Sequence, residues 1–285
     1  MDSKITLVEC PRDAMQGWKH FIPTERKVDY LNALLKVGFD VLDFGSFVSA
    51  KAIPQLADTK LVIPQLDLTS TKTKLLAIIA NTRGAEEAVV YDEITYLGFP
   101  FSISETFQMR NTNKTIAQSL TQVEEIQNLC AKNGKELVIY ISMGFGNPYG
   151  DAYNAALAID WVGKIANLGV RTIAMSDTVG VANPANISYI FNELIPAFKN
   201  VNIGAHFHST PDKWMEKIDT AYNNGCIRFD SAMKGIGGCP MAEDELVGNI
   251  ATENIVGWCA DKGIKLNIDQ EAFFEALNMA SGIFI

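Results

Sequence analysis

Short apolar, β-branched segments alternate with amphipathic segments along this 285-residue chain. Such alternation predicts βαβ units and a parallel sheet, because a helix must return the chain to the same edge before the next parallel strand begins. The predicted strands are residues 5–9, 41–44, 60–66, 87–91, 136–142, 172–176, 203–208 and 227–232. The third is the weakest, since it contains Pro64. The predicted helices are residues 25–37, 116–133, 154–167, 186–198, 210–223, 245–262 and 270–280.

Eight strand–helix units without a break in composition favour a single (β/α)8 TIM barrel over residues 1–285, with extra C-terminal helices. An open doubly wound sheet is the alternative. It is disfavoured because no Gly-x-Gly-x-x-Gly motif follows the first predicted strand. The barrel prediction places the active site at the carboxyl ends of the strands.

The composition of the chain disfavours some classes of binding partner and some cellular locations. The net charge of −9 and the lack of a basic cluster disfavour nucleic acid. No apolar run is long enough to span a membrane, and the N-terminus leads into the first predicted strand without a targeting sequence. The five cysteines lack CxxC spacing, which argues against a disulfide framework or a zinc clip. We therefore expect a protein of the reducing cytoplasm.

Two of the three histidines, His206 and His208, end the seventh predicted strand. Residues two apart on a strand face the same side, so both imidazoles can reach one point. Taken alone, the pair fits a metal site or strand-end side chains satisfied by the backbone about equally well. In a barrel, Asp13 and Asn249 would approach the same mouth. Their alternative roles are a turn or helix N-cap for Asp13 and a helix N-cap for Asn249.

One carboxylate, two imidazoles and one amide oxygen suit Mg²⁺ or Mn²⁺, although other divalent ions also fit. Such a set leaves room for substrate oxygens, which is typical of a catalytic site. The neighbouring Arg12 is permanently charged and could stabilise an enolate or carboxylate oxygen; a salt bridge to a nearby acid is its alternative role.

Cys239 lies between glycines and a proline, in a loop that could close over the mouth. A thiol there would be placed for proton transfer, whereas its alternative role is that of a small buried apolar residue. Other polar residues at the predicted strand ends are Asp43, Ser46, Asp92, Glu93, Ser142, Ser176 and Asp177.

At these positions the chain resembles the 3-hydroxy-3-methylglutaryl-CoA lyases, within the wider family of barrel metallolyases and Claisen condensing enzymes. The resemblance spans about Ile5 to Asn278. The matching motifs are, in order, Pro11-Arg12-Asp13 with Gln16, Ser46-Phe47-Val48-Ser49, Ser104-Glu105, Ser176-Asp177-Thr178, His206-x-His208, Gly237-Gly238-Cys239-Pro240 and Gly248-Asn249. The histidine pair is shared across the wider family, whereas the Gly-Gly-Cys-Pro loop indicates the lyase branch.

The resemblance implies cleavage of 3-hydroxy-3-methylglutaryl-CoA, or a close 3-hydroxyacyl-CoA, to acetyl-CoA and acetoacetate. It also implies a homodimer and a place in leucine degradation. The implied metal ligands are Asp13, His206, His208 and Asn249. The implied catalytic residues are Arg12, Asp43, Cys239 and His206, and the implied substrate-binding residues are Gln16, Ser46, Ser142 and Asp177.

Several features depart from the lyase pattern. Met143 and Asn147 replace small residues or Cys near the end of the fifth predicted strand, the segment between Cys239 and Asn249 is one residue longer than usual, and the approach Glu9-Cys10-Pro11 is one residue shorter. Asp43 stands where Glu is usual, and Ser209 where Asp is usual after the second histidine. Two other functions compete with the lyase. One is an acetyl-CoA-dependent condensing synthase acting on a 2-oxo acid. The other is a barrel that has lost its activity and serves as a binding partner.

Overall fold

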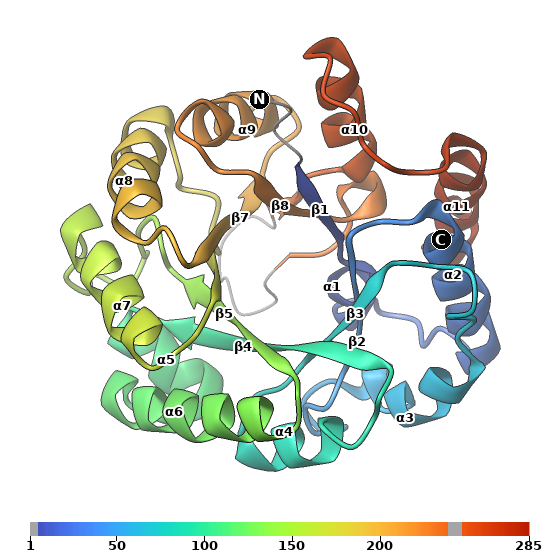
Figure 1. Ribbon diagram of the computed structural model, residues 1–285, viewed down its shortest axis with the longest axis horizontal. Helices are drawn as coiled ribbons and strands as arrows, with labels where there is room; N and C mark the ends of the chain where they lie inside the picture. The colour runs from blue at the N-terminus through green and yellow to red at the C-terminus, as the bar shows by residue number, and fades with distance from the viewer. Residues whose placement is uncertain (1–4, 239–246, 285) are drawn as a thin grey trace.

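The computed structural model describes residues 5–238 and 247–284, and in it eight parallel strands close into a barrel (Figure 1). The strands are β1 (Thr6–Glu9), β2 (Val41–Ser46), β3 (Lys74–Ile78), β4 (Ile94–Ser102), β5 (Glu136–Ser142), β6 (Thr172–Asp177), β7 (Asn202–Ser209) and β8 (Arg228–Ser231). Each strand pairs with the next, and β8 pairs with β1 in the register Thr6 to Arg228. The predicted (β/α)8 barrel is therefore confirmed.

The helices surround this barrel on its outside, except that the first one lies inside their ring, beside β2 (Figure 1). They are α1 (Pro11–Gln16), α2 (Thr24–Val37), α3 (Thr59–Val62), α4 (Thr82–Ala88), α5 (Glu105–Thr112), α6 (Ile116–Lys132), α7 (Ala155–Asn167), α8 (Pro184–Ala197), α9 (Trp214–Asn223), α10 (Thr252–Asp261) and α11 (Gln270–Ile283). The last of these packs against α2, near the start of the chain. None of the helices in the described parts of the chain is both long and apolar enough to span a bilayer.

Two predicted strands are wrong. Residues 60–66 form the end of α3 and a 3-10 turn, Ile63–Gln65, which buries Val62 and Ile63 against the core. Residues 87–91 form the end of α4 and a turn. A short apolar run fits a buried helical turn as well as a strand, so periodicity alone does not separate the two.

The true third and fourth strands are β3 and β4, which follow these segments in the chain. Asp92 and Glu93 consequently precede β4 and lie at the amino end of the barrel, away from the mouth. The polar residue that ends β4 is Ser102.

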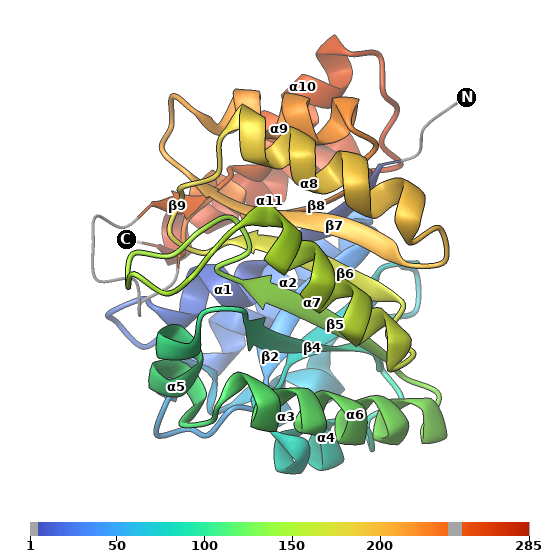
Figure 2. The same ribbon diagram turned by 90° about the vertical axis from the view of Figure 1, so that its left-hand side faces the viewer.

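A short strand, β9 (Gly248–Asn249), lies beyond the barrel and pairs antiparallel with the end of β7 (Figure 2). Asn249 is opposite His208 in this pairing. A residue from the last fifth of the chain is thereby placed beside the histidines.

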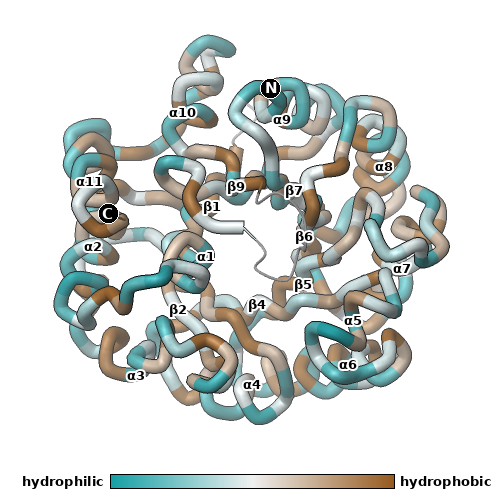
Figure 3. The backbone as a smooth tube through the Cα atoms, turned by 180° about the vertical axis from the view of Figure 1, so that it is seen from behind, coloured by the Kyte–Doolittle hydropathy of each residue, from teal (hydrophilic) through white to brown (hydrophobic). Residues whose placement is uncertain are grey.

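Apolar side chains form the layer between the strands and the helices, and Figure 3 shows hydrophobic segments along the strands with hydrophilic stretches on the surrounding helices. The interior of the barrel contains a smaller apolar cluster with Val8, Leu76 and Val138. Charged side chains are also buried in this interior: Arg228 lies at the start of β8, and Asp43 and Asp230 lie further along their strands.

Candidate metal centre and cavity

A cavity of about 530 Å³ opens at the carboxyl ends of the strands. Its lining includes six of the predicted site residues: Arg12, Asp13, Gln16, Ser142, His206 and His208. Apolar side chains such as Val48, Ile53 and Phe107, with Arg110 and Asn111 from α5, line other parts of it. The barrel therefore places one polar corner in a mostly apolar cavity.

Three of the four predicted ligands, Asp13, His206 and His208, meet in that corner. Asp13 comes from α1, whose start is fixed by Pro11 at the first helical position, and both histidines come from β7. One ligand atom of each of these three residues lies within 4.8 Å of one from each of the others. The two imidazole centroids are 5.2 Å apart. Segments nearly 200 positions apart in the chain are thus brought to one point.

The ring of His208 has one nitrogen in a hydrogen bond and one that can donate its lone pair to a cation. Its Nδ1 lies 3.0 Å from the carbonyl oxygen of Thr178, and because a carbonyl only accepts, Nδ1 carries the proton. Nε2 then bears the lone pair, and it is buried without a hydrogen-bond partner among the described residues. Burial and the neighbouring His206 lower the pKa of His208 to about 4, so the ring is neutral near pH 7. An unpartnered, neutral imidazole nitrogen is what a metal ion requires.

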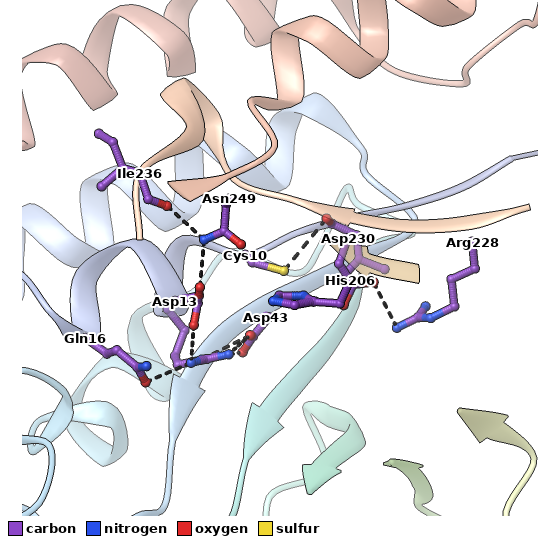
Figure 4. A network of polar contacts seen from close by, with 11 residues as sticks. Cys10, Asp13, Gln16, Asp43, His206, Arg228, Asp230, Ile236 and Asn249 are labelled. Atoms are coloured by element: carbon purple, nitrogen blue, oxygen red, sulfur yellow. Dashed lines mark hydrogen bonds and ion pairs between the residues drawn. The ribbon is translucent and has the colours of Figure 1, made fainter. Parts of the chain in front are cut away.

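Asn249 completes the group. Its Nδ2 donates to Asp13 Oδ2 at 2.6 Å and to the carbonyl oxygen of Ile236 at 2.9 Å (Figure 4). Both amide protons are thereby used, so the amide oxygen is the atom that Asn249 can offer to a cation. Gly237 has a φ of +98°, and a Cβ there would lie 2.7 Å from Asn249 Nδ2. Only glycine fits this approach.

Asp13 is ionised in this setting. Burial raises the pKa of its carboxyl, but the charges of Arg12, His206 and His208 outweigh burial and leave the pKa below its usual range. Its Oδ1 accepts from Arg12 Nη1 at 2.9 Å. The group therefore offers one carboxylate beside imidazole nitrogens and an amide oxygen, which fits a divalent cation.

Arg12 is buried between carboxylates. Its Nε donates to Asp43 Oδ2 at 3.0 Å, and its Nη1 donates to Gln16 Oε1 at 2.8 Å. Burial disfavours its charge, but Asp43 and Asp13 favour it more, so the pKa of Arg12 is raised further. Although Asp43 is one methylene shorter than Glu, both of its oxygens contact the Arg12 guanidinium. Burial raises the pKa of Asp43 to about 6 despite that contact.

Three predicted site residues are not seen at the cavity, nor in a side-chain hydrogen bond with Arg12 or the grouped ligands, within the part of the chain that the structure describes. Ser46 is buried, and its Oγ accepts from the backbone N–H of Val48. Asp177 is also buried, and its Oδ2 accepts from Lys217 Nζ at 2.6 Å. Neither is among the described residues that line the cavity. Cys239, the third, lies outside the described residues.

Lys217 was missed at the sequence level. Besides Asp177, its Nζ donates to the carbonyl oxygen of His208 at 2.8 Å and to that of Gly180 at 3.1 Å. The side chain is 1% exposed. Asp177 and Lys217 thus fix the backbone at His208. Trp214, three residues before Lys217, and Ala221, four residues after it, were the available signal, because they place this lysine on an apolar face of α9.

Asp230 on β8 was missed as well. Its Oδ2 lies 3.3 Å from Nδ1 of His206, on the side of the ring away from Asp13 (Figure 4). Burial lowers the pKa of His206, but the contact with Asp230 more than offsets this, and the pKa is raised. Arg228 and Asp230, two apart on one strand, were the sequence signal for a polar face inside the barrel.

Comparison with known proteins places the chain among lyases. The HMGL-like family model matches residues 4–280. The hydroxymethylglutaryl-CoA lyase of Bacillus subtilis is 31% identical over 277 residues, which cover 96% of this chain and 91% of the relative. The human cytoplasmic 3-hydroxy-3-methylglutaryl-CoA lyase is 28% identical, covering 95% of this chain and 73% of the relative.

Among solved structures, an HMG-CoA lyase from Acinetobacter baumannii in complex with coenzyme A and 3-methylmalate superimposes with a TM-score of 0.91. It is 30% identical, and the alignment covers 100% of this chain and 92% of that one. The family model covers nearly the whole chain. The protein therefore belongs to the HMGL-like family, whose members are metal-dependent carbon–carbon lyases.

Proposed function

We propose that this protein is a divalent-metal-dependent lyase that cleaves 3-hydroxy-3-methylglutaryl-CoA, or a close 3-hydroxyacyl-CoA, to acetyl-CoA and acetoacetate. The observation that carries the proposal is the meeting of Asp13, His206 and His208 beside Arg12 in one cavity. The lyases similar to this chain, including one described with coenzyme A, support an acyl-CoA substrate.

Asp13, His206 and His208 would hold the cation together with the amide oxygen of Asn249, and we propose Mg²⁺ or Mn²⁺ because half of the donors are oxygens. The unpartnered Nε2 of His208 supports this assignment. A bound divalent cation polarises substrate oxygens and acidifies a hydroxyl group.

Cleavage without a redox step requires a place for the electron pair of the broken bond. A base near the metal would take the proton of the tertiary hydroxyl at C3, and the C–O bond at C3 would become the ketone of acetoacetate as the C2–C3 bond breaks. The electron pair of that bond then becomes the enolate of acetyl-CoA. Arg12 would stabilise the enolate oxygen, and Asp43 and Gln16 would hold the guanidinium in place. We assign protonation of the enolate carbon to Cys239, which also explains a cysteine within the Gly-Gly-Cys-Pro loop.

Gln16 and Ser142 line the cavity, and we propose that they contact the acyl group. The burial and hydrogen bonds of Ser46 and Asp177 support a structural role, since both side chains already contact protein partners. We propose that Asp177 orients the backbone of His208 through Lys217, and that Ser46 shapes the turn after β2. Neither is proposed to touch substrate.

The direct test is an assay of purified protein stripped of metal, incubated with 3-hydroxy-3-methylglutaryl-CoA and then titrated with Mg²⁺ or Mn²⁺. Acetyl-CoA and acetoacetate should appear in equal amounts, and only with metal. His208→Ala should abolish the reaction, whereas His20→Ala, which alters an exposed histidine in the loop after α1, should leave the rate unchanged. No product from any of several 3-hydroxyacyl-CoAs would disprove the proposal.

The same preparation tests the condensing alternative. Acetyl-CoA and a range of 2-oxo acids would be added, and free CoA measured. Release of CoA only in the presence of an oxo acid would identify a synthase instead of a lyase.

We further propose a homodimer, a cytoplasmic location and a part in leucine degradation. These follow from the resemblance to the lyases, whose relatives include cytoplasmic and mitochondrial forms. Light scattering coupled to gel filtration would measure the mass in solution, and twice the 31.3 kDa of one chain is the expected result.

A further inference from the structure

A carboxylate lies behind one of the two histidines of the candidate metal centre. Asp230 and His206 are Cα partners in the pairing of β7 with β8, so strand register itself places their side chains together. The distance from Asp230 Oδ2 to His206 Nδ1 is 3.3 Å, and the Asp230 side chain is 0% exposed. No mobile surface residue is involved in this contact.

An ionised carboxylate only accepts hydrogen bonds, so it fixes the proton of His206 on Nδ1. The lone pair is then on Nε2, the nitrogen available to a cation shared with Asp13 and His208. His208 reaches the same tautomer through the carbonyl oxygen of Thr178. The two imidazoles therefore present equivalent nitrogens through different partners, one a backbone carbonyl and the other a replaceable side chain.

Arg228 is placed to balance the charge of Asp230. Its Nη2 lies 3.7 Å from Asp230 Oδ1, and its side chain is 3% exposed. Gly204 on β7 makes room for it, because a Cβ there would lie 2.8 Å from Arg228 Cδ. A buried carboxylate without a cation would cost several kcal/mol. Arg228 thus places a cation beside the Asp230 carboxyl group within the barrel interior.

Cys10 offers a competing interpretation, since its thiol, His206 and Asp230 also have donor atoms within 4.8 Å of one another. A soft metal could use that group. Metal binding requires the thiolate, however, and burial, with Asp230 and Asp43 nearby, raises the pKa of Cys10 well above its usual range. The contact between His206 and Asp230 is therefore better explained as a hydrogen bond.

We propose that Asp230 is a positioning residue of the metal centre, which fixes His206 in the tautomer protonated on Nδ1 and thereby sets the affinity of the site for its divalent cation. This inference rests on the proposed metal centre but not on the identity of the substrate. Asp230 itself touches neither cation nor substrate in this arrangement.

Nuclear magnetic resonance tests the tautomer directly. Long-range ¹H–¹⁵N spectra of ¹⁵N-histidine-labelled, metal-free protein distinguish the two tautomers once the pH is raised until the imidazoles are neutral. Three histidines give a spectrum simple enough to assign with His20→Gln and His208→Gln. We expect His206 to carry its proton on Nδ1. A wild-type ring protonated on Nε2 would overturn the proposal without any variant.

Asp230→Asn gives the second measurement. An asparagine amide can donate to Nδ1 and stabilise the other tautomer, so we expect the proton to move to Nε2. The affinity for Mn²⁺, measured from the electron paramagnetic resonance signal of the free ion, should fall about 10- to 100-fold. Asp230→Glu, which keeps an accepting carboxylate, should recover part of that loss. A change of less than about twofold in Asp230→Asn would contradict the proposal.

Two further variants separate positioning from stability. Asp58→Asn removes a different buried carboxylate, paired with Lys27 at 2.7 Å, and should change stability but neither the tautomer nor the Mn²⁺ affinity. Asp230→Asn/Arg228→Met removes the unbalanced cation as well, in case the single variant does not fold. If the wild-type protein showed no lyase activity but Asp230→Asn still lowered its Mn²⁺ affinity, this inference would be supported and the proposed reaction rejected.

Discussion

Arg12 contacts two carboxylates and an amide at once, and this explains why its replacement affects more than catalysis. We expect Arg12→Met to lower kcat about 10²- to 10³-fold, since the enolate would lose the guanidinium proposed to stabilise it. Asp43 and Asp13 would also lose their buried partner, at a cost of about 3–5 kcal/mol in the free energy of unfolding. Steady-state kinetics and urea denaturation measure the two effects. Arg12→Lys should retain more stability than activity, because lysine cannot reproduce the planar contact.

Glu9 predicts how stability depends on pH. Burial raises its pKa to about 8 in the folded protein, against a usual value of 4.5, although its oxygens accept from the Thr252 hydroxyl and the Met233 N–H. Glu253 and Tyr30 are the other titratable groups that face it. Between pH 4.5 and 8 the unfolded chain has lost this proton and the folded one retains it. The free energy of unfolding should therefore decrease as pH rises through this window.

Glu9→Gln keeps an acceptor for Met233 and a donor towards Thr252, so it imitates the protonated acid. We expect the variant to match the wild type at low pH and to exceed its stability near pH 8. Glu253→Gln serves as a control that retains the buried carboxyl. Parallel stability curves for wild type and Glu9→Gln across this range would disprove the assignment.

The grouping of Asp13, His206 and His208 could be predicted from the sequence, because their residue types and strand-end positions suffice to suggest a site. Their supporting residues could not. Asp230 becomes a partner of His206 only through the register of β7 with β8, and Lys217 reaches His208 only after α9 packs on the barrel. Asp177 was predicted to bind substrate because its ion pair with Lys217 is also formed only in the folded protein.

Among the elements, β5 was predicted with its observed bounds, whereas β3 and β4 were missed. Glu136–Ser142 is a β-branched run between clear turn signals, and hence unambiguous. Lys74–Ile78 is rich in leucine and alanine, which favour helices when taken alone. In the barrel, tertiary pairing on both sides overrides that preference.

The ion pair of Lys217 with Asp177 connects three elements: α9, the end of β6 and the end of β7. We expect Lys217→Met to cost about 3–5 kcal/mol in the free energy of unfolding, because Asp177 would remain buried without its cation. Adding Asp177→Asn should recover part of this cost. Urea denaturation of the two single variants and the double variant measures the coupling, and additive effects would show that the pair does not act as a unit.

At the scale of the whole molecule, the first strand pairs with the eighth and the last helix packs against α2. We propose that the chain is one catalytic domain, and we expect circular dichroism and tryptophan fluorescence to report one coincident unfolding transition. Mn²⁺ at 100 times its Kd should add about 2.7 kcal/mol to the stability. His208→Ala should remove this gain, and two separate transitions would argue for two domains.

The short ribbon formed by β7 and β9 determines where Asn249 sits, since that residue is aligned directly opposite His208. The pairing of β9 with β7, and not the length of the connection after β8, therefore determines the position of Asn249. That connection is one residue longer here than the lyase pattern, yet Asn249 still reaches Asp13. Changes in the length or sequence of that connection should therefore leave Asn249 beside Asp13 and opposite His208.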